Sequence, residues 1–380
     1  MSPTVCLAAN AIGYPEGGGH MWVYLNWALG LRALGCQVIW LEGIWPGAAE
    51  HDVRTKVADL KSRLEPYGLG EQLALFSWSG EPIPSEAAQG CLGVEVAAEA
   101  ELLLNIAYDI PQEVVARFRR TALLDIDPGL TQVWMSAGTM QVPPHNVYFT
   151  TGETVGKPGG RVPDVGLNWL YAPPCVALDW WSPHQPAAGA PFTTVSHWYM
   201  GESGEWEEDS GELYRNDKRD GFLPFLDLPA YTAQPLELAL NLGADGDGER
   251  GALEKQGWRV QNASEVASTP WAYQRYVQDS RGEFSCVKPS CIRLQNAWIS
   301  DRTLCYLASG KPAVIQHTGP SRILPDAAGL FRFRDMDQAI RSLEVVAADY
   351  DRQCKLARQL AEEHFDARRV AHSVLEQALA

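Results

Sequence analysis

Residues 280–321, SRGEFSCVKPSCIRLQNAWISDRTLCYLASGKPAVIQHTGPS, decide the fold that the sequence predicts. The stretch begins with the short apolar strand 283–287 and continues through a polar loop to an amphipathic helix over 300–309. Residues 313–316 then form a buried-type strand that leads to the small polar loop 318–321. In open α/β sheets, ligands bind at the carboxyl ends of the strands, and helix N-termini there favour anionic groups. The two polar loops therefore predict a nucleotide-binding site.

The segment Leu-Ala-Ser-Gly-Lys-Pro at 307–312 follows the predicted helix and precedes a short strand. The spacing of Ala308, Gly310 and Pro312 resembles the donor half of GT-B glycosyltransferases of the group 1 or family 4-like kind, where the segment is roughly E-A-x-A-x-G-x-P-V-V. This resemblance implies an α/β, GT-B-like fold with two Rossmann-like domains and a cleft between them. The ribose-binding Glu of that family falls on Cys305 here, so the chain departs from the family pattern at this position.

Asp301 lies one helical turn before Cys305 and gives two alternatives. Its carboxylate can reach the ribose hydroxyls in place of the family's Glu, or, like Ser300, it can only cap the helix. The loops and the helix N-terminus supply the candidate donor-binding residues Glu283, Ser285, Lys288, Ser300, Asp301, Arg302, Thr318, Gly319 and Ser321.

Length and charge limit the classes of function. A chain of 380 residues with 46% apolar residues is long enough for about two domains with real cores. The formal net charge of −16, with an isoelectric point near 4.9, argues against nonspecific binding to nucleic acid or anionic lipid. A local basic pocket stays open as an alternative.

Eight cysteines are scattered without a C-x-x-C pair or zinc-type spacing. We interpret them as reduced thiols of a cytoplasmic enzyme, and we expect no metal site. The N-terminus has neither a basic region nor a long apolar run, so we expect no signal peptide and no transmembrane segment, while peripheral membrane contact stays open.

The N-terminal forty residues predict a βαβ unit, with strands over 4–9 and 36–41 and a helix from about His20 to Leu34. The glycine loop at 13–19, in which Gly17, Gly18 and Gly19 precede His20, allows close approach of a ligand on the acceptor side. It does not match the spaced G-x-G-x-x-G fingerprint of dinucleotide-binding enzymes.

The resemblance implies that His20 is a general base, because many GT-B enzymes place a histidine after this loop. An imidazole titrating near neutral pH suits removal of a proton from an attacking hydroxyl. The alternative is that His20 caps the helix or binds substrate without moving a proton.

Three carboxylates at predicted strand ends are further candidates. Asp125 and Asp127 lie at the C-terminal end of the strand 123–126, and Glu153 follows the strand 148–151. They can bind a polyhydroxylated acceptor or assist His20, whereas a Pro-Gly turn capped by aspartate explains the same letters at 125–129.

Lys218 and Arg219 occupy the place where the resemblance implies a basic residue that neutralises the departing nucleotide diphosphate. They lie shortly after the strand 192–198, the acidic loop 201–212 and the segment around Tyr214. The alternative is surface charge. A metal-independent mechanism would use these cations and helix dipoles to stabilise the leaving group.

The predicted domains are an N-terminal acceptor-binding domain over 1–186, a C-terminal donor-binding domain over 187–345, and C-terminal helices over 346–380 that return to the first domain, as in GT-B folds. Together these features predict a glycosyltransferase of hexosyltransferase type that uses a UDP-, GDP- or TDP-sugar and no cofactor. A sugar-nucleotide epimerase of the same fold and a non-catalytic nucleotide-sugar-binding protein are the alternatives. The acceptor, the stereochemistry and the oligomeric state stay open.

Overall fold

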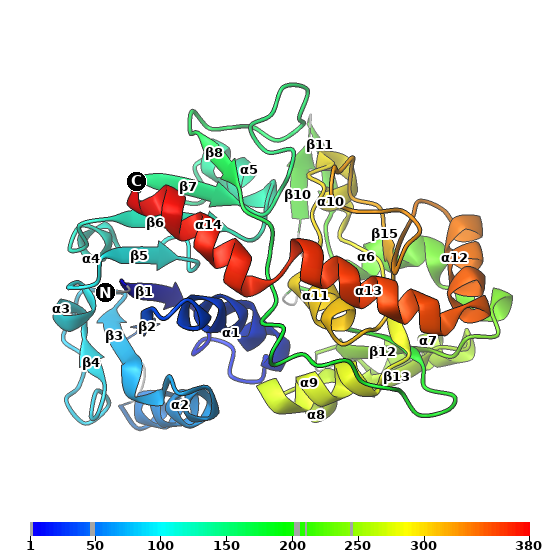
Figure 1. The fold of residues 1–380 in the computed structure, drawn as a ribbon, viewed down its shortest axis with the longest axis horizontal. Coiled ribbons are helices and arrows are strands. Elements are labelled where there is room, and N and C mark those ends of the chain that lie inside the picture. The colour runs from blue at the N-terminus through cyan, green and yellow to red at the C-terminus, as the bar shows by residue number, and fades with distance from the viewer. Residues whose placement is uncertain (1–2, 46–49, 201–205, 210, 244–245) are drawn as a thin grey trace. The chain divides into compact units, whose positions relative to one another are not determined.

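The computed structural model describes residues 3–45, 50–200, 206–209, 211–243 and 246–380. The chain divides into two compact units. Unit 1 contains Met1–Pro158, Val162–Ala177 and Asp366–Ala380, and unit 2 contains Gly159–Arg161 and Leu178–Phe365. Each unit is built around its own parallel sheet (Figure 1).

The sheet of unit 1 has eight strands in the order β4-β3-β2-β1-β5-β6-β7-β8, all paired in parallel. Its central strands are nearly continuous apolar runs, because helices bury both faces of a parallel sheet. The strands are β1 Thr4–Ala9, β2 Gln37–Ile44, β3 Leu73–Ser77, β4 Leu92–Gly93, β5 Leu102–Asn105, β6 Thr121–Asp125, β7 Val147–Thr150 and β8 Trp169–Tyr171.

The helices of unit 1 connect successive strands, except for the last one. They are α1 Gly18–Ala33, α2 Glu50–Leu64, α3 Val94–Ala97, α4 Gln112–Val115, α5 Leu130–Ala137 and α14 Ala367–Leu379. Helix α14, red in Figure 1, lies against α1 although the two are at opposite ends of the chain. Residues 176 and 177 link the two helices, since the Ala367 amide donates to the Val176 carbonyl and the Ala177 amide donates to Oδ1 of Asn26 in α1.

The sheet of unit 2 has six parallel strands in the order β13-β12-β9-β14-β15-β16. They are β9 Phe192–His197, β12 Leu236–Asn241, β13 Arg259–Asn262, β14 Gly282–Ser285, β15 Ala313–Gln316 and β16 Leu330–Phe333. The helices are α6 Lys218–Phe222, α7 Asp247–Lys255, α8 Ala263–Val266, α9 Pro270–Asp279, α10 Pro289–Leu294, α11 Asp301–Ala308, α12 Met336–Ala348 and α13 Tyr350–His364. Strand order reverses between β9 and β14, and in unit 1 between β1 and β5, so each sheet has a topological switch point.

The prediction of an α/β fold with two Rossmann-like parts is confirmed. Two local expectations were wrong, and one helix was missed. The expected loop 201–212 contains part of an antiparallel hairpin, β10 Trp206–Asp209 and β11 Glu212–Arg215, while residues 201–205 and 210 lie outside the described ranges. Helix α1 already begins at Gly18, so Gly18 and Gly19 are helical and not part of the loop. Helix α10, with Pro289 at its first position, was not predicted.

The divisions between units differ from the sequence-based domain boundaries at 186 and 345. Residues 178–186 pack with unit 2, where the His184 amide donates to the Ser309 carbonyl and Arg358 Nη1 donates to the Trp181 carbonyl. Helices α12 and α13 also belong to unit 2, and only α14 belongs to unit 1.

All eight cysteines are free thiols. Within the described ranges, the structure contains no helix with the length and apolar character needed to span a bilayer.

The core of unit 2 is organised around Phe284 in β14. Its ring stacks on Phe333 at a centroid distance of 5.3 Å and packs with Phe222 and Trp258, and only 1% of the residue is exposed. We predict that Phe284→Ala destabilises the protein by about 3–5 kcal/mol, because it leaves a cavity among rigid aromatic neighbours. Hydrogen exchange should lose protection in β9 and β14 while β1 and β5 keep theirs.

Leu213→Ala is the matched control, since Leu213 in β11 is 64% exposed and should change stability by less than about 0.5 kcal/mol. Equal loss of protection in both sheets of the Phe284→Ala variant would contradict the assignment of a separate core to each unit.

Candidate functional site

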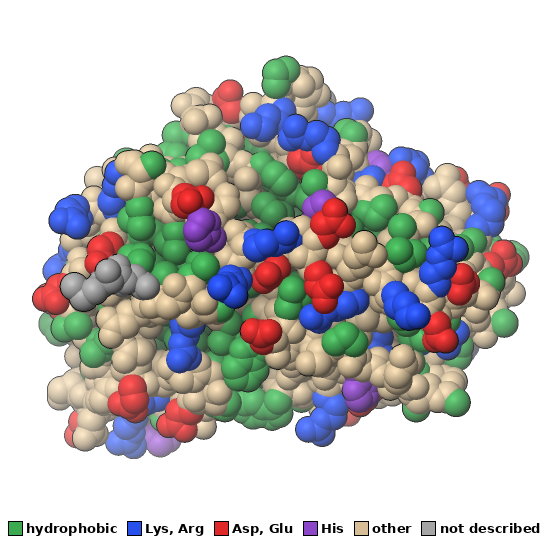
Figure 2. All heavy atoms as spheres, viewed as in Figure 1, with side chains coloured by type: hydrophobic (Ala, Val, Ile, Leu, Met, Phe, Trp, Pro, Cys, Tyr) green, Lys and Arg blue, Asp and Glu red, His purple; other side chains and the backbone are tan. Residues whose placement is uncertain are grey.

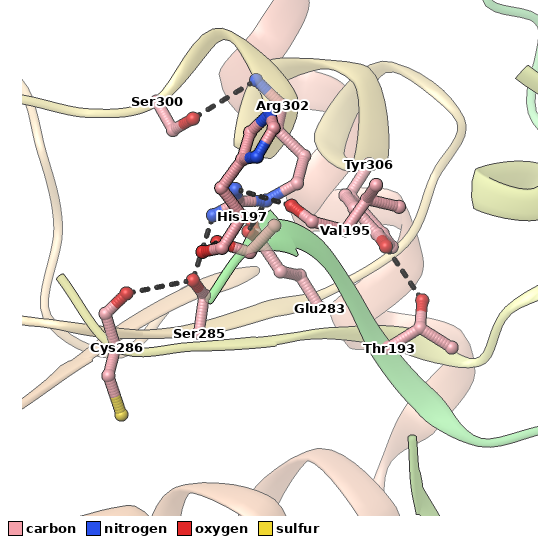
Figure 3. A network of polar contacts seen from close by, with 10 residues as sticks. Thr193, Val195, His197, Glu283, Ser285, Cys286, Ser300, Arg302 and Tyr306 are labelled. Atoms are coloured by element: carbon pink, nitrogen blue, oxygen red, sulfur yellow. Dashed lines mark hydrogen bonds and ion pairs between the residues drawn. The ribbon is translucent and has the colours of Figure 1, made fainter. Parts of the chain in front are cut away.

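The switch point of unit 2 is occupied by the Arg302 side chain (Figure 3). Its Nε donates to Glu283 Oε1 at 2.8 Å, Nη2 donates to Ser285 Oγ at 2.8 Å, and Nη1 donates to the Val195 carbonyl at 3.1 Å. The guanidinium therefore joins β9 to β14 where the strand order reverses. Glu283 is fully buried and is paired with a cation, as a buried carboxylate requires.

Local sequence places Arg302 at this point. Ser300 is the N-cap of α11, and its Oγ accepts a hydrogen bond from the Arg302 amide at 3.3 Å. This cap puts Asp301 and Arg302 in the first turn, and Asp301 is the acidic residue of that turn. Behind them, the Tyr306 hydroxyl lies 2.6 Å from Oγ1 of Thr193, the second residue of β9, so this contact connects α11 to the start of that strand.

Lys218 is a second buried cation close to Arg302. Burial and, to a smaller extent, the positive charge of Arg302 lower its pKa to about 7, while the Cys291, Cys286 and Glu283 side chains act in the opposite direction. The residue is 8% exposed, and the structure gives its ammonium no hydrogen bond or ion pair within the described ranges. Lys218 is thus an amine whose charged form its own surroundings disfavour.

The position of Lys218 follows from the packing of α6, of which it is the first residue. A Cβ on Gly221 would overlap the Val287 carbonyl oxygen, so glycine allows α6 to lie directly against the loop after β14. Asn216 Oδ1 accepts from the Ser290 amide at 2.8 Å and Asp217 Oδ1 accepts from the Met200 amide at 2.8 Å. These contacts fix the start of the helix beside the switch point.

Arg219 differs from Lys218 although the two are adjacent. Its Nε donates to Glu249 Oε1 at 2.7 Å, and the same oxygen accepts from Trp198 Nε1 at 2.9 Å. The guanidinium is therefore already paired with a carboxylate. Of the two cations proposed for a diphosphate, Lys218 is the better candidate.

The remaining donor-side candidates surround the loops of unit 2. Lys288 is the N-cap residue of α10 and is half-buried. Thr318 is buried and its Oγ1 donates to the Trp298 carbonyl at 2.7 Å, while the Gly319 amide donates to His317 Nδ1 at 3.1 Å. Ser321 Oγ accepts from the amides of residues 323 and 324. These interactions shape the loop after β15.

In unit 1, His20 lies in the first turn of α1 beside the end of β1. Its Nε2 is 2.9 Å from the Asn10 carbonyl oxygen, which can only accept, so Nε2 carries the hydrogen and the lone pair is on Nδ1. Burial lowers the pKa of His20, whereas the bond to Asn10 and the charge of Asp127 partly offset this effect. The imidazole is therefore neutral at pH 7 and able to accept a proton.

Asp125 and Asp127, which were predicted together, have different surroundings. Asp125 is fully buried and accepts from Thr131 Oγ1, Gln132 Nε2 and Thr150 Oγ1 at 2.7–2.8 Å, and burial raises its pKa to about 6. Asp127 is exposed and accepts from the Tyr108 hydroxyl at 3.1 Å. Asp125 thus organises the turn, while Asp127 is the carboxylate whose charge acts on His20.

Glu153, the third predicted carboxylate, is 6% exposed after β7. Gly17 precedes α1 as its N-cap residue. A pocket lies between this loop and α2, and its lining residues are Ala11, Ile12, Tyr14, Pro15, Gly17, Met21, Lys56, Asp59, Leu60 and Arg63.

Glu42, which holds the loop before His20, was not predicted as a site residue from the sequence. Glu42, at the end of β2, is fully buried and accepts from the amides of Ala11 and Ile12 and from Trp40 Nε1. A single acidic residue after the predicted strand 36–41 was the signal, but the hydrogen bonds from the loop to its carboxylate are not visible in the sequence. Tyr24, whose hydroxyl lies 3.3 Å from His20 Nε2, and Tyr108, which donates to Asp127, were not predicted either.

Comparison with known proteins adds information on the fold. The sequence matches no protein-family model and no curated protein. Solved structures match over nearly the whole chain. Sucrose-phosphate synthase from Thermosynechococcus elongatus is 11% identical, with 99% of this chain and 98% of that chain covered and a TM-score of 0.53.

Two further solved structures are similar to this chain in fold. HepE from Anabaena, solved in complex with UDP-glucose, is 11% identical over 99% of both chains with a TM-score of 0.57. An alpha-glucosyltransferase, solved with UDP and a 13-mer DNA containing an HMU base, is 10% identical over 100% of both chains with a TM-score of 0.58. These proteins are GT-B glycosyltransferases, and this chain has the GT-B fold.

Glu42 gives a prediction for stability against pH. Burial raises the pKa of Glu42 from the ordinary 4.5 to about 7, although its hydrogen bonds from Trp40, Ala11 and Ile12 oppose the shift. Between these values the folded state binds the proton more tightly than the unfolded chain, so this residue contributes less stability as the pH rises. We predict that the advantage of the wild type over Glu42→Gln, measured by thermal unfolding, shrinks as pH rises through this window.

Glu113→Gln, at an exposed position of α4, should show no such trend. A wild-type advantage that grows with pH would contradict the protonation of Glu42 in the folded state.

Proposed function

We propose that this protein is a glycosyltransferase that moves a hexosyl group from a UDP-sugar to an acceptor hydroxyl without a metal ion. The observation that carries the proposal is the buried Lys218 amine, which has no hydrogen bond or ion pair within the described ranges and lies close to Arg302 at the switch point of a GT-B sheet. UDP is the first choice of nucleotide because HepE and the alpha-glucosyltransferase were solved with UDP or UDP-glucose.

The reaction needs a cation at the leaving group. The acceptor oxygen forms a bond to the anomeric carbon, the bond from that carbon to the diphosphate oxygen breaks, and the electron pair leaves with UDP. Negative charge thus develops on the diphosphate, and a fixed cation in a site of low dielectric constant stabilises it strongly. We assign this role to Lys218, with Arg302 held by Glu283 as a second positive charge behind it.

The first turn of α11 supports the assignment. Its N-terminus favours anionic groups, and Ser300 and Asp301 are the residues there that can meet the nucleotide. We assign Asp301 to the ribose hydroxyls, since the family's glutamate position is Cys305, a buried thiol.

On the acceptor side we assign His20 as the general base. The bond from Nε2 to the Asn10 carbonyl orients the ring, and Nδ1 is the atom that takes the proton from the acceptor hydroxyl. The charge of Asp127 stabilises the imidazolium that forms.

The donor assignment predicts that Lys218→Ala weakens UDP binding by about ten- to a hundredfold and uridine binding little, because a charge-assisted hydrogen bond is worth roughly 1.5–3 kcal/mol. Titration calorimetry should also show that wild-type UDP binding above pH 7 takes up a proton, since the diphosphate favours the charged form of an amine whose pKa is about 7. Affinity should fall as the pH rises above this value.

Lys255→Ala, on the exposed end of α7, is the matched control and should bind UDP normally. The same titrations with EDTA test metal independence. Equal losses for uridine and UDP would place Lys218 away from the diphosphate, and loss of UDP binding in EDTA would overturn the metal-free proposal.

The acceptor assignment predicts that His20→Ala binds UDP normally. Transfer of the glucosyl group from UDP-glucose to an acceptor, measured as release of UDP, should be about 10²- to 10⁴-fold slower, the range of a positioned general base. The wild-type rate should decline on the acidic side below pH 6.5, because the pKa of His20 is lowered from that value, and the variant should lose this limb.

His372→Ala, at an exposed position of α14, should retain both rate and profile. If His20→Ala keeps the wild-type rate, the base is another group, and Asp127 is the next residue to replace.

A further inference from the structure

Two tryptophans at the carboxyl edge of the unit 1 sheet are stacked on each other. Trp45 follows β2 and Trp78 follows β3, and the Trp78 amide donates to the Ile44 carbonyl at 2.9 Å. Their ring centroids are 5.9 Å apart and the rings are inclined by only 15°. This geometry is that of an offset-stacked aromatic pair.

The inner indole is held in place by its surroundings. A Cβ on Gly43 would overlap the Trp78 indole and lie 2.7 Å from the Phe76 ring, so the absence of a side chain at Gly43 makes room for both rings. Phe76 also meets Trp78 edge-on at 4.9 Å. Trp45 rests on this support and is 64% exposed. One face of its indole covers Trp78, and the other is available to a ligand.

The stacked pair lies on the same edge of the sheet as His20. Strand β3 is the second neighbour of β1 in the sheet, and both run in the same direction. Trp45 follows β2, the neighbour of β1, and lies three residues beyond Glu42, which pairs with the last residue of β1, so at about 3.3 Å per residue it is about 10 Å past the end of β1. A ligand that reaches both His20 and Trp45 must be longer than one sugar ring.

The size of the exposed apolar surface and the net charge of the chain limit the kinds of ligand that can bind at Trp45. The exposed large hydrophobic residues in the described part of unit 1 are Trp45, Val96 and Leu379, which lie on separate elements. Protein-binding and membrane-binding faces need contiguous apolar areas of several hundred Å², whereas one indole face suits one flat ring. Nucleic acid and anionic lipid are disfavoured by the net charge of −16.

We propose that Trp45, supported by Trp78, stacks on a pyranose ring of the acceptor, at least one ring away from the hydroxyl that reacts. The acceptor is then an oligosaccharide or a glycoside with two or more rings. This inference rests on the proposed function, because it assigns the acceptor to unit 1.

The test uses the full-length protein and a panel of mono-, di- and trisaccharides of glucose with α1,4, β1,4 and β1,3 linkages, with affinity measured by calorimetry. The wild type should bind at least one trisaccharide more tightly than glucose. Trp45→Ala should bind that trisaccharide about tenfold more weakly, while its affinity for glucose and for UDP stays unchanged. Trp45→Phe keeps a stacking face and should recover most of the loss.

Trp271→Ala is the matched control, since Trp271 is a 43% exposed tryptophan on α9 of unit 2 and should leave saccharide binding unchanged. Equal trisaccharide affinity in Trp45→Ala and wild type, or no saccharide bound by the wild type, overturns the inference. Trp45-dependent binding of single-stranded DNA or of phosphatidylcholine vesicles, in place of saccharide, also overturns it. Saccharide binding through Trp45 without any UDP binding would instead overturn the proposed transferase and leave a carbohydrate-binding protein.

Discussion

The ion pair between Arg302 and Glu283 is the interaction on which the site in unit 2 depends. Burying either charge alone would cost several kcal/mol, and the pair is tolerable because Arg302 also donates to Ser285 and to the Val195 carbonyl. Four groups from β9, β14 and α11 are thereby fixed at the point where the strand order reverses. The charge of Glu283 also favours the charged form of Lys218, but burial and the charge of Arg302 act more strongly in the opposite direction. The amine therefore sits beside a guanidinium with its pKa lowered to about 7.

The buried carboxylates Glu42 and Asp125 of unit 1 are paired with neutral donors, whereas Glu283 of unit 2 is paired with a cation. Glu42 and Asp125 accept hydrogen bonds from backbone and side-chain donors of the loops that follow β1 and β6. Burial raises the pKa of Glu42 to about 7 and the pKa of Asp125 to about 6. Their oxygens accept hydrogen bonds that shape these loops, and the proposed function assigns the substrate contacts to the exposed Asp127 and to His20 instead.

Local signals allowed much of the fold to be predicted. The bounds of β15 agree with the sequence because Pro312 precedes the strand and a polar segment follows it, and the cap at Ser300 was recognisable for similar reasons. Contacts between distant segments could not be predicted. Nothing in the letters around Gly221 indicates that it touches Val287, and this contact turns an apparent surface lysine into a buried one. The partner of Arg219, Glu249, lies thirty residues away, so the two adjacent cations looked equivalent.

Because the chain is strongly acidic, binding of a nucleotide diphosphate depends on where individual cations lie. Lys and Arg side chains are interspersed with Asp and Glu on the face shown in Figure 2, and the chain as a whole carries −16. A field of this sign repels a nucleotide diphosphate at long range, and salt weakens that repulsion within a Debye length of about 8 Å at physiological ionic strength. Attraction must then come from contacts that form at short range, where water is excluded and screening is weak. In the proposed function, a buried amine with a pKa near 7 suits this task, because only part of its population is charged at pH 7 and contact with the anion favours the charged form. Less charge is then buried before the nucleotide binds than with a permanently charged side chain.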